Sequence, residues 1–295
     1  MNKEITIAGK KLFYRVSGNG RPVMLVHGFG ETGDVWNRQV AFLKGDYKLI
    51  VPDLPGSGQS DIIDDMSMEG MAEALKVILD AERSPHQTSP KEGGLDSSKK
   101  LLTGSESSQV PPLGGFRGAS LIGHSMGGYV ALAFAEKYGE MLNGLGLFHS
   151  TPFADTEEKK AARRKGIAFI EEHGAFEFLK TSTPNLFSPG FKAESPELVD
   201  EFVQSLNNFL PESLVLYYES MIKRPDRSSI LKKSSLPVLF IMGEFDTAIP
   251  LQDGLKQCHL PERAYINILH QSGHMGMMEE TDKSNRLLKE FLSER

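Results

Sequence analysis

The chain has 295 residues, of which 39% are hydrophobic and 24% charged, and its formal net charge is −6. This composition is typical of a globular protein whose core is large enough for one domain with an insertion or for two domains. The negative balance argues against a surface that binds nucleic acid or an anionic membrane, because such surfaces need clustered Lys and Arg. Small uncharged or amphipathic substrates are not excluded.

The compartment is predicted from the cysteine count and from the first residues. The single cysteine, Cys258, cannot form an internal disulfide. The opening stretch, MNKEITIAGKKLFYRV, carries charges where a signal peptide would have its apolar core, and no run of about 18 apolar residues occurs. These features predict a cytoplasmic protein without a membrane span.

The elements follow a regular order along the chain. Two alternating stretches at the start, KEITIAG and KLFYRVSG, predict an antiparallel ribbon. Short apolar runs follow, each typical of a strand buried on both faces: PVMLVHG, YKLIVPD, ASLIGHS, LNGLGLFHS, LPVLFIMGEFD and AYINILH. Segments with helical spacing separate them, for example residues 67–80, where Ser67 is the expected N-cap. The pattern predicts an α/β fold with a mostly parallel central sheet and helices on both faces.

Two segments interrupt this order. Residues 151–235 contain several helical patterns and no buried strand, which predicts an all-helical lid over one end of the sheet. Half of the 32 residues in the segment 84–115 are Ser, Gly or Pro, which predicts a flexible low-complexity insertion. The predicted α/β core therefore comprises residues 1–150 and 236–295.

Reactive residues follow four of the predicted strands. They lie in the loops HGFG, GHSMGG, GEFD and HQSGH. The loops at the carboxyl ends of parallel strands gather at one edge of an open sheet, where ligands bind. We therefore expect these four loops to meet in one site.

The segment GHSMGG places Ser125 between a predicted strand and a predicted helix. Glycines at positions 123 and 127 permit a strained turn that lifts the hydroxyl out, and the helix behind it directs N–H groups and its dipole toward that point. A serine nucleophile needs a base, and the base needs a group that fixes its tautomer. Asp246 and His274 follow Ser125 in the chain order of strand–turn–helix serine hydrolases. We predict these three as the catalytic residues, and the N–H groups of Phe29 and Met126 as the oxyanion hole.

The motifs HGFG, PDLPGSGQS, GHSMGG, GEFD and SGH occur in the order found in the α/β-hydrolase fold superfamily. Over nearly the whole chain outside the insertion, the sequence resembles lid-bearing carboxylesterase-like serine hydrolases of that family. It is also similar to enol-lactonases, perhydrolases and acyl-carrier-protein methyl esterases. The resemblance favours His274, which ends SGH, over His270, and it favours Asp246, which begins DTAIP, over Glu244.

Other polar residues near these motifs have more modest expected roles. His27 and Asp53 are predicted to hold their loops, and His124 is predicted to pack beside the nucleophile and point away from it. His149 and Phe153 are predicted to contact substrate, because they lie where the chain enters the lid. The many phenylalanines of the lid favour an apolar acyl pocket.

The predicted function is hydrolysis of carboxylic esters of small to medium, largely apolar substrates through an acyl-enzyme, with no cofactor and no metal. The same triad would also serve a thioesterase, a perhydrolase or a carbon–carbon bond hydrolase. A haloalkane dehalogenase or an epoxide hydrolase of this fold would have aspartate in place of Ser125. A non-catalytic ligand receptor is the alternative from a different class. The expected partner is a small-molecule ester, and the sequence predicts no particular protein partner.

Overall fold

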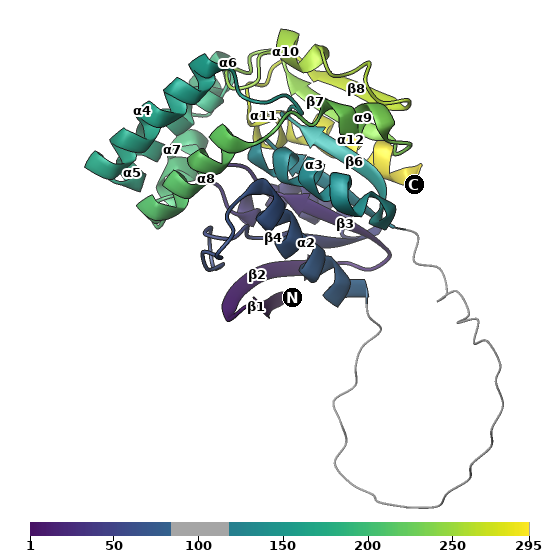
Figure 1. Ribbon diagram of the computed structural model, residues 1–295. Coiled ribbons are helices and arrows are strands. Elements are labelled where there is room, and N and C mark those ends of the chain that lie inside the picture. The colour runs from purple at the N-terminus through teal and green to yellow at the C-terminus, as the bar shows by residue number, and fades with distance from the viewer. Residues whose placement is uncertain (84–117, 295) are drawn as a thin grey trace, which may run out of the picture.

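The fold is described from a computed structural model, which places residues 1–83 and 118–294 (Figure 1). The predicted insertion at residues 84–115 lies outside the described residues. Within them, no helix has both the length and the apolar character needed to cross a membrane.

An eight-stranded sheet forms the centre of the molecule, in the order β1-β2-β4-β3-β5-β6-β7-β8. Strand β2 pairs antiparallel with β1 and with β4, and all other neighbours pair in parallel. The mostly parallel sheet and the N-terminal ribbon are as predicted. The strands are β1 (Asn2–Ile7), β2 (Lys10–Ser17), β3 (Arg21–Val26), β4 (Tyr47–Pro52), β5 (Ala119–His124), β6 (Leu142–Phe148), β7 (Val238–Gly243) and β8 (Ala264–Leu269).

Helices cover both faces of this sheet (Figure 1). The α-helices are α1 (Asn37–Leu43), α2 (Met68–Arg83), α3 (Met126–Tyr138), α4 (Glu157–His173), α5 (Ala175–Ser182), α6 (Pro189–Glu194), α7 (Pro196–Ser205), α8 (Pro211–Lys223), α9 (Ser228–Lys233), α10 (Leu251–Leu255), α11 (Gly276–Glu279) and α12 (Thr281–Ser293). Short 3₁₀ helices are η1 (Gly33–Trp36), η2 (Gly139–Met141) and η3 (Thr183–Leu186). Helix α2 begins as predicted, because the Ser67 hydroxyl accepts a hydrogen bond from the Gly70 N–H at 3.0 Å.

The continuously apolar strands are explained by two cores, one on each face. In β3, Met24 and Val26 join a cluster that includes α2 and α3, whereas Val23 and Leu25 join a second cluster with Trp36 and helix α12. Because successive side chains of a strand point to opposite faces, a strand buried on both faces must be apolar throughout. Strand β1, at the edge of the sheet, instead alternates between exposed and partly buried residues.

Helices α4 to α9 form one continuous helical segment between β6 and β7. Figure 1 shows α4, α5, α7 and α8 standing at one end of the sheet. Helix α5 lies directly over the loop after β3, since a Cβ added at Gly30 would come within 2.6 Å of the Leu179 side chain. The helical segment thus covers the carboxyl edge of the sheet.

Candidate active site

Ser125 occupies a strained turn between β5 and α3. Its backbone has φ +50° and ψ −117°, a conformation that a residue with a side chain rarely adopts. The turn is held on both sides: the Ser125 N–H donates to Phe148 O at 2.9 Å, and its carbonyl accepts from the Ser150 hydroxyl at 2.7 Å. The strain therefore persists because neighbouring strand β6 and its turn fix the serine from two directions.

Glycines make this turn possible by leaving no room for side chains. A Cβ at Gly123 would lie 2.3 Å from Gly127 O, and a Cβ at Gly127 would lie 2.4 Å from His27 O. The start of α3 is thereby pressed against the end of β3. A Cβ at Gly28 would lie 3.1 Å from the Ser125 Cβ, so the HGFG loop lies directly beside the serine.

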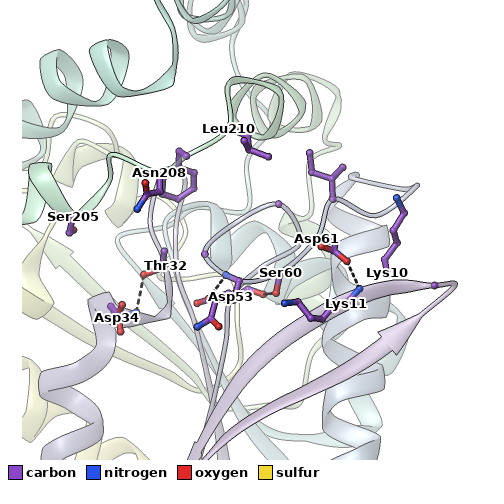
Figure 2. Close-up of a pocket in the computed structure, with 16 residues that line it drawn as sticks. Lys10, Lys11, Thr32, Asp34, Asp53, Ser60, Asp61, Ser205, Asn208 and Leu210 are labelled. Atoms are coloured by element: carbon purple, nitrogen blue, oxygen red, sulfur yellow. Dashed lines mark hydrogen bonds between the residues drawn. The ribbon is translucent and has the colours of Figure 1, made fainter.

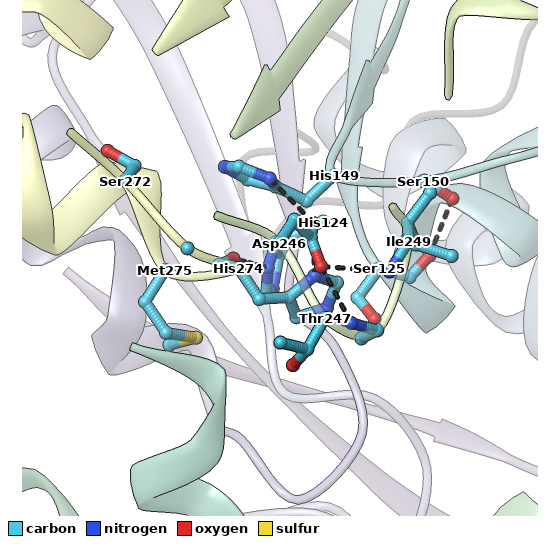
Figure 3. Close-up of polar contacts among 12 residues, drawn as sticks. His124, Ser125, His149, Ser150, Asp246, Thr247, Ile249, Ser272, His274 and Met275 are labelled. Atoms are coloured by element: carbon cyan, nitrogen blue, oxygen red, sulfur yellow. Dashed lines mark hydrogen bonds and ion pairs between the residues drawn. The ribbon is translucent and has the colours of Figure 1, made fainter. Parts of the chain in front are cut away.

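His274 and Asp246 are in direct contact, as the sequence predicts. His274 Nδ1 lies 2.7 Å from Asp246 Oδ2, and both side chains are almost fully buried (Figure 3). The other oxygen, Asp246 Oδ1, accepts the N–H groups of Ala248 and Ile249 at 2.9 and 2.8 Å. These bonds fix the carboxylate and place the proton of the imidazole on Nδ1, which leaves Nε2 free to accept a proton.

The electrostatics of this pair suit a base. Burial alone would lower the pKa of His274, but the charge of Asp246 and its hydrogen bond outweigh burial and raise the pKa. Burial acts to raise the pKa of Asp246, yet the two histidines that contact it hold that pKa far below the usual range for a carboxyl. Asp246 is therefore ionised across the physiological pH range.

A second histidine contacts the same carboxylate oxygen. His149 Nδ1 lies 3.0 Å from Asp246 Oδ2, and the His149 ring is completely buried. Figure 3 shows His149 and His274 approaching Asp246 together. This position differs from the prediction that His149 contacts substrate: the ring packs behind the carboxylate. The sequence placed His149 correctly at the end of a strand but did not show which way the turn directs its side chain.

His124 does not merely pack beside the nucleophile. Its Nδ1 lies 2.9 Å from Glu31 Oε2, and its Nε2 lies 2.9 Å from the carbonyl oxygen of His274. Both ring nitrogens thus lie within hydrogen-bond distance of an oxygen atom. Glu31 and His124 form a buried hydrogen-bonded pair, which links the nucleophile turn to the backbone of His274.

Glu31 is the residue that sequence reasoning missed. Its Oε2 also accepts the N–H of Gly28 at 2.7 Å, so it fixes the HGFG loop. Burial acts to raise the pKa of Glu31, but the contact with His124 outweighs burial and lowers it. The only signal in the sequence was an acidic residue directly after HGFG.

His27 and Asp53 hold their loops, as predicted. His27 Nδ1 lies 2.8 Å from Gly28 O, while its Nε2 accepts the N–H of Leu54 at 2.8 Å. Asp53 accepts the N–H groups of Gly33 and Gln59. These bonds join the HGFG loop to the loop after β4.

His270 and Glu244, the alternatives to His274 and Asp246, form a pair with each other. His270 Nδ1 lies 2.7 Å from Glu244 Oε2, and 68% of the His270 side chain and 45% of the Glu244 side chain are exposed. Their exposure separates them from the buried Asp246 and His274.

Two cavities border the site region without containing Ser125. A polar cavity of about 900 Å³ lies between the ribbon turn, the loop after β4 and residues 205–210 (Figure 2). A cavity of about 280 Å³ is lined in part by Phe153, Thr151 and Ile249. Phe153 therefore shares a cavity with Ile249, which belongs to the loop that carries Asp246.

The fold is that of the α/β-hydrolase family. The model of that family matches residues 23–285, and the chain belongs to it. The chain is 27% identical to lipase 1 of Psychrobacter immobilis, over 99% of this chain and 84% of the lipase. It is 25% identical to 2-hydroxy-6-oxo-6-phenylhexa-2,4-dienoate hydrolase of Comamonas testosteroni, over 96% of this chain and 92% of that enzyme.

A solved structure is similar over the whole chain. The thermophilic esterase of Thermogutta terrifontis superposes with a TM-score of 0.83 at 27% identity, covering 100% of this chain and 98% of the esterase. The relatives therefore include both ester hydrolases and carbon–carbon bond hydrolases, and the chain is an α/β hydrolase with esterase and lipase relatives.

Proposed function

We propose that this protein is a serine hydrolase that cleaves carboxylic esters through an acyl-enzyme, with Ser125, His274 and Asp246 as its catalytic triad. The observation that carries the proposal is the buried His274–Asp246 contact of 2.7 Å at the sheet edge where Ser125 occupies its strained turn. The similarity to lipase 1 and to the Thermogutta terrifontis esterase supports the ester specificity.

In the proposed first half-reaction, the Ser125 hydroxyl attacks the ester carbonyl while His274 Nε2 accepts its proton. His274 then donates that proton to the departing alcohol, which leaves an ester between substrate acyl group and Ser125. Water, deprotonated by the same nitrogen, releases the acid and restores the serine. Asp246 stabilises the imidazolium at each step.

We propose that the N–H groups of Phe29 and Met126 bind the oxyanion. Met126 is the first residue of α3, so its N–H is free of the helical ladder and lies at the positive end of the helix dipole. Phe29 follows Gly28, whose backbone lies against Ser125. Removing one such donor typically lowers kcat by about 10²–10³ in serine hydrolases.

Residues 151–235 are proposed as the lid that shapes an apolar substrate pocket. The Phe29 ring stacks on Tyr218 of α8 with centroids 4.3 Å apart, and Phe178 of α5 meets it edge-on at 6.2 Å. Phe153 would contribute to the same pocket from the start of the lid. Aromatic side chains packed around Phe29, the residue after Gly28, favour small to medium, largely apolar acyl groups.

A second candidate is a carbon–carbon bond hydrolase, favoured by the similarity to the Comamonas testosteroni dienoate hydrolase. The same triad would be used, but the substrate would be a vinylogous diketone and not an ester. Thioesterase and perhydrolase activities remain alternatives with the same three residues.

The experiment is a series of p-nitrophenyl esters from acetate to decanoate, run beside a 2-hydroxy-6-oxodienoate and an acyl thioester. A fluorophosphonate probe followed by peptide mass spectrometry locates the nucleophile. We expect fastest turnover of a short or medium ester and a label on Ser125. Faster turnover of the dienoate would replace the ester proposal, and the absence of both turnover and label would favour a ligand receptor.

A further inference from the structure

The turn after β6 contacts both ends of the proposed triad. Phe148 O accepts the Ser125 N–H, the Ser150 hydroxyl donates to Ser125 O, and His149 between them reaches Asp246 Oδ2. Adjacent side chains thus fix the nucleophile and the acid separately. The positive φ of His149, +49°, is the backbone feature that directs them to different targets.

His149 is unfavourable for stability in two respects. A left-handed backbone at a residue with a side chain costs roughly 1–3 kcal/mol. Its Nε2 is buried without a hydrogen-bond partner in the described part of the chain, which adds a desolvation cost. Gly243 and Gly276 leave room for the ring, since a Cβ on either would lie 2.9 Å or less from it. Two unfavourable features at one buried residue point to function.

We propose that His149 is a positioning residue that shares the Asp246 carboxylate with His274 and thereby sets how strongly this carboxylate stabilises the imidazolium. The inference deepens the proposed function and rests on it. His149 donates Nδ1–H to the same oxygen that His274 uses, so it withdraws negative charge from that oxygen and prevents the carboxylate from rotating. It touches no substrate.

His149 acts as a neutral donor. Burial lowers the pKa of His149 to about 4, although the hydrogen bond that His149 donates to Asp246 acts in the opposite direction. A charged ring here would compete with His274 for the carboxylate, whereas a neutral ring only shares it. The other titratable groups near the two rings are His124, which adjoins both, and Glu31 and Glu279, which act on His274.

The test compares His149→Leu with His149→Asn. Leucine fills similar space without a donor, whereas the asparagine amide can replace Nδ1–H and tolerates a left-handed backbone. In His149→Leu, Asp246 should stabilise the His274 imidazolium more, so the acid limb of kcat/KM should move up by about one pH unit. We expect kcat to fall about tenfold, because the carboxylate is less firmly held. His149→Asn should restore both values most of the way.

An exposed histidine near the same loop provides the control. His270→Leu should leave the pH profile and kcat at the wild-type values. Melting temperatures identify any variant that is merely unstable. The proposal would be overturned if kcat fell equally in His149→Leu and His149→Asn. It would also be overturned if the acid limb of kcat/KM in His149→Leu stayed at the wild-type pH.

A spectroscopic readout separates this inference from the ester proposal. In ¹⁵N-labelled protein, His149 and His274 should each show an Nδ1–H proton at low field, and the His149 signal should vanish in both variants. The His274 signal should shift in His149→Leu only. If the wild type shows these signals but turns over no ester, the proposed ester hydrolysis is wrong and the sharing of the Asp246 carboxylate is supported. If His149 carries its proton on Nε2, His149 does not share the carboxylate and this inference is wrong.

Discussion

The carboxyl edge of the sheet and the underside of the helical segment above it are held by different kinds of contact. At the sheet edge, buried charges and hydrogen bonds of 2.7–3.0 Å join Glu31, His124, His274, Asp246 and His149. On the underside of the helical segment, stacked and edge-on rings dominate. Hydrogen bonds require a narrow range of distances and angles, whereas a pair of aromatic rings can pack in several stacked or edge-on arrangements. Changes at the edge should therefore alter the chemistry, and changes beneath the helices should alter which substrate fits.

The largest effect is expected from Ser125→Ala. Removing the nucleophile should lower kcat for a p-nitrophenyl ester by about 10⁴-fold or more, since only oxyanion and binding contributions would remain. A melting temperature near the wild-type value would show that the fold is kept. Retention of most of the activity would disprove the proposed mechanism.

The next prediction compares His274→Asn with His270→Asn. The first should reduce kcat by about 10³–10⁴, because the proton acceptor is lost, and the second should change it less than twofold. In the wild type, labelling by the fluorophosphonate should slow as pH falls through the pKa of His274, which Asp246 raises above the ordinary value of a histidine. The labelling rate against pH measures this. An equal loss in both variants would contradict the choice of His274.

Glu31→Gln should affect both stability and rate. The amide keeps the shape of the side chain but removes its charge, and losing a buried hydrogen bond to a charged group costs about 1.5–3 kcal/mol of unfolding free energy. We expect kcat to fall about tenfold, because Gly28 and the His274 backbone lose their common anchor. Urea unfolding and ester kinetics measure the two effects, and a variant as stable as the wild type would contradict a stabilising role for the Glu31 carboxylate.

Tyr218→Leu tests the aromatic contacts beneath the helical segment. Loss of the ring that stacks on Phe29 should change the order of preference among acyl chain lengths, with KM changes of about fivefold and little change in kcat for the best ester. Steady-state kinetics across the ester series measure it. A large loss of kcat with unchanged KM values would indicate that the helical segment supports the chemistry itself.

The smallest effect is expected from deleting residues 84–115. Helix α2 ends at Arg83 before this segment, and strand β5 begins at Ala119 after it, whereas Ser125 follows the opposite end of β5. We expect kcat/KM of the deletion variant to stay within about twofold of the wild-type value. A large loss in a variant that melts cooperatively would contradict this.

The fold could be predicted because each buried strand is a continuous apolar run that ends in glycine, proline or a reactive residue. Ser125, Asp246 and His274 could be proposed for the same reason, since the turn chemistry is local. The direction of a buried side chain is not local. His149 lies beside Asp246 only because β6 and β7 are neighbours and its φ is positive, and Glu31 meets His124 across 93 residues of chain. Neither pairing has a short-range signature.

The close packing around Ser125 also affects how a mutational scan of this region should be interpreted. Because Gly123 and Gly127 each face backbone oxygens at less than 2.5 Å from an added Cβ, even alanine there would displace main chain. A mutational scan scored by protein abundance would therefore mark these two positions as intolerant, and a scan scored by turnover would mark the same two. At Ser125 the scans should diverge, since its alanine variant adds no atoms. The difference between the two maps, and not the activity map alone, would separate the reacting residue from its scaffold.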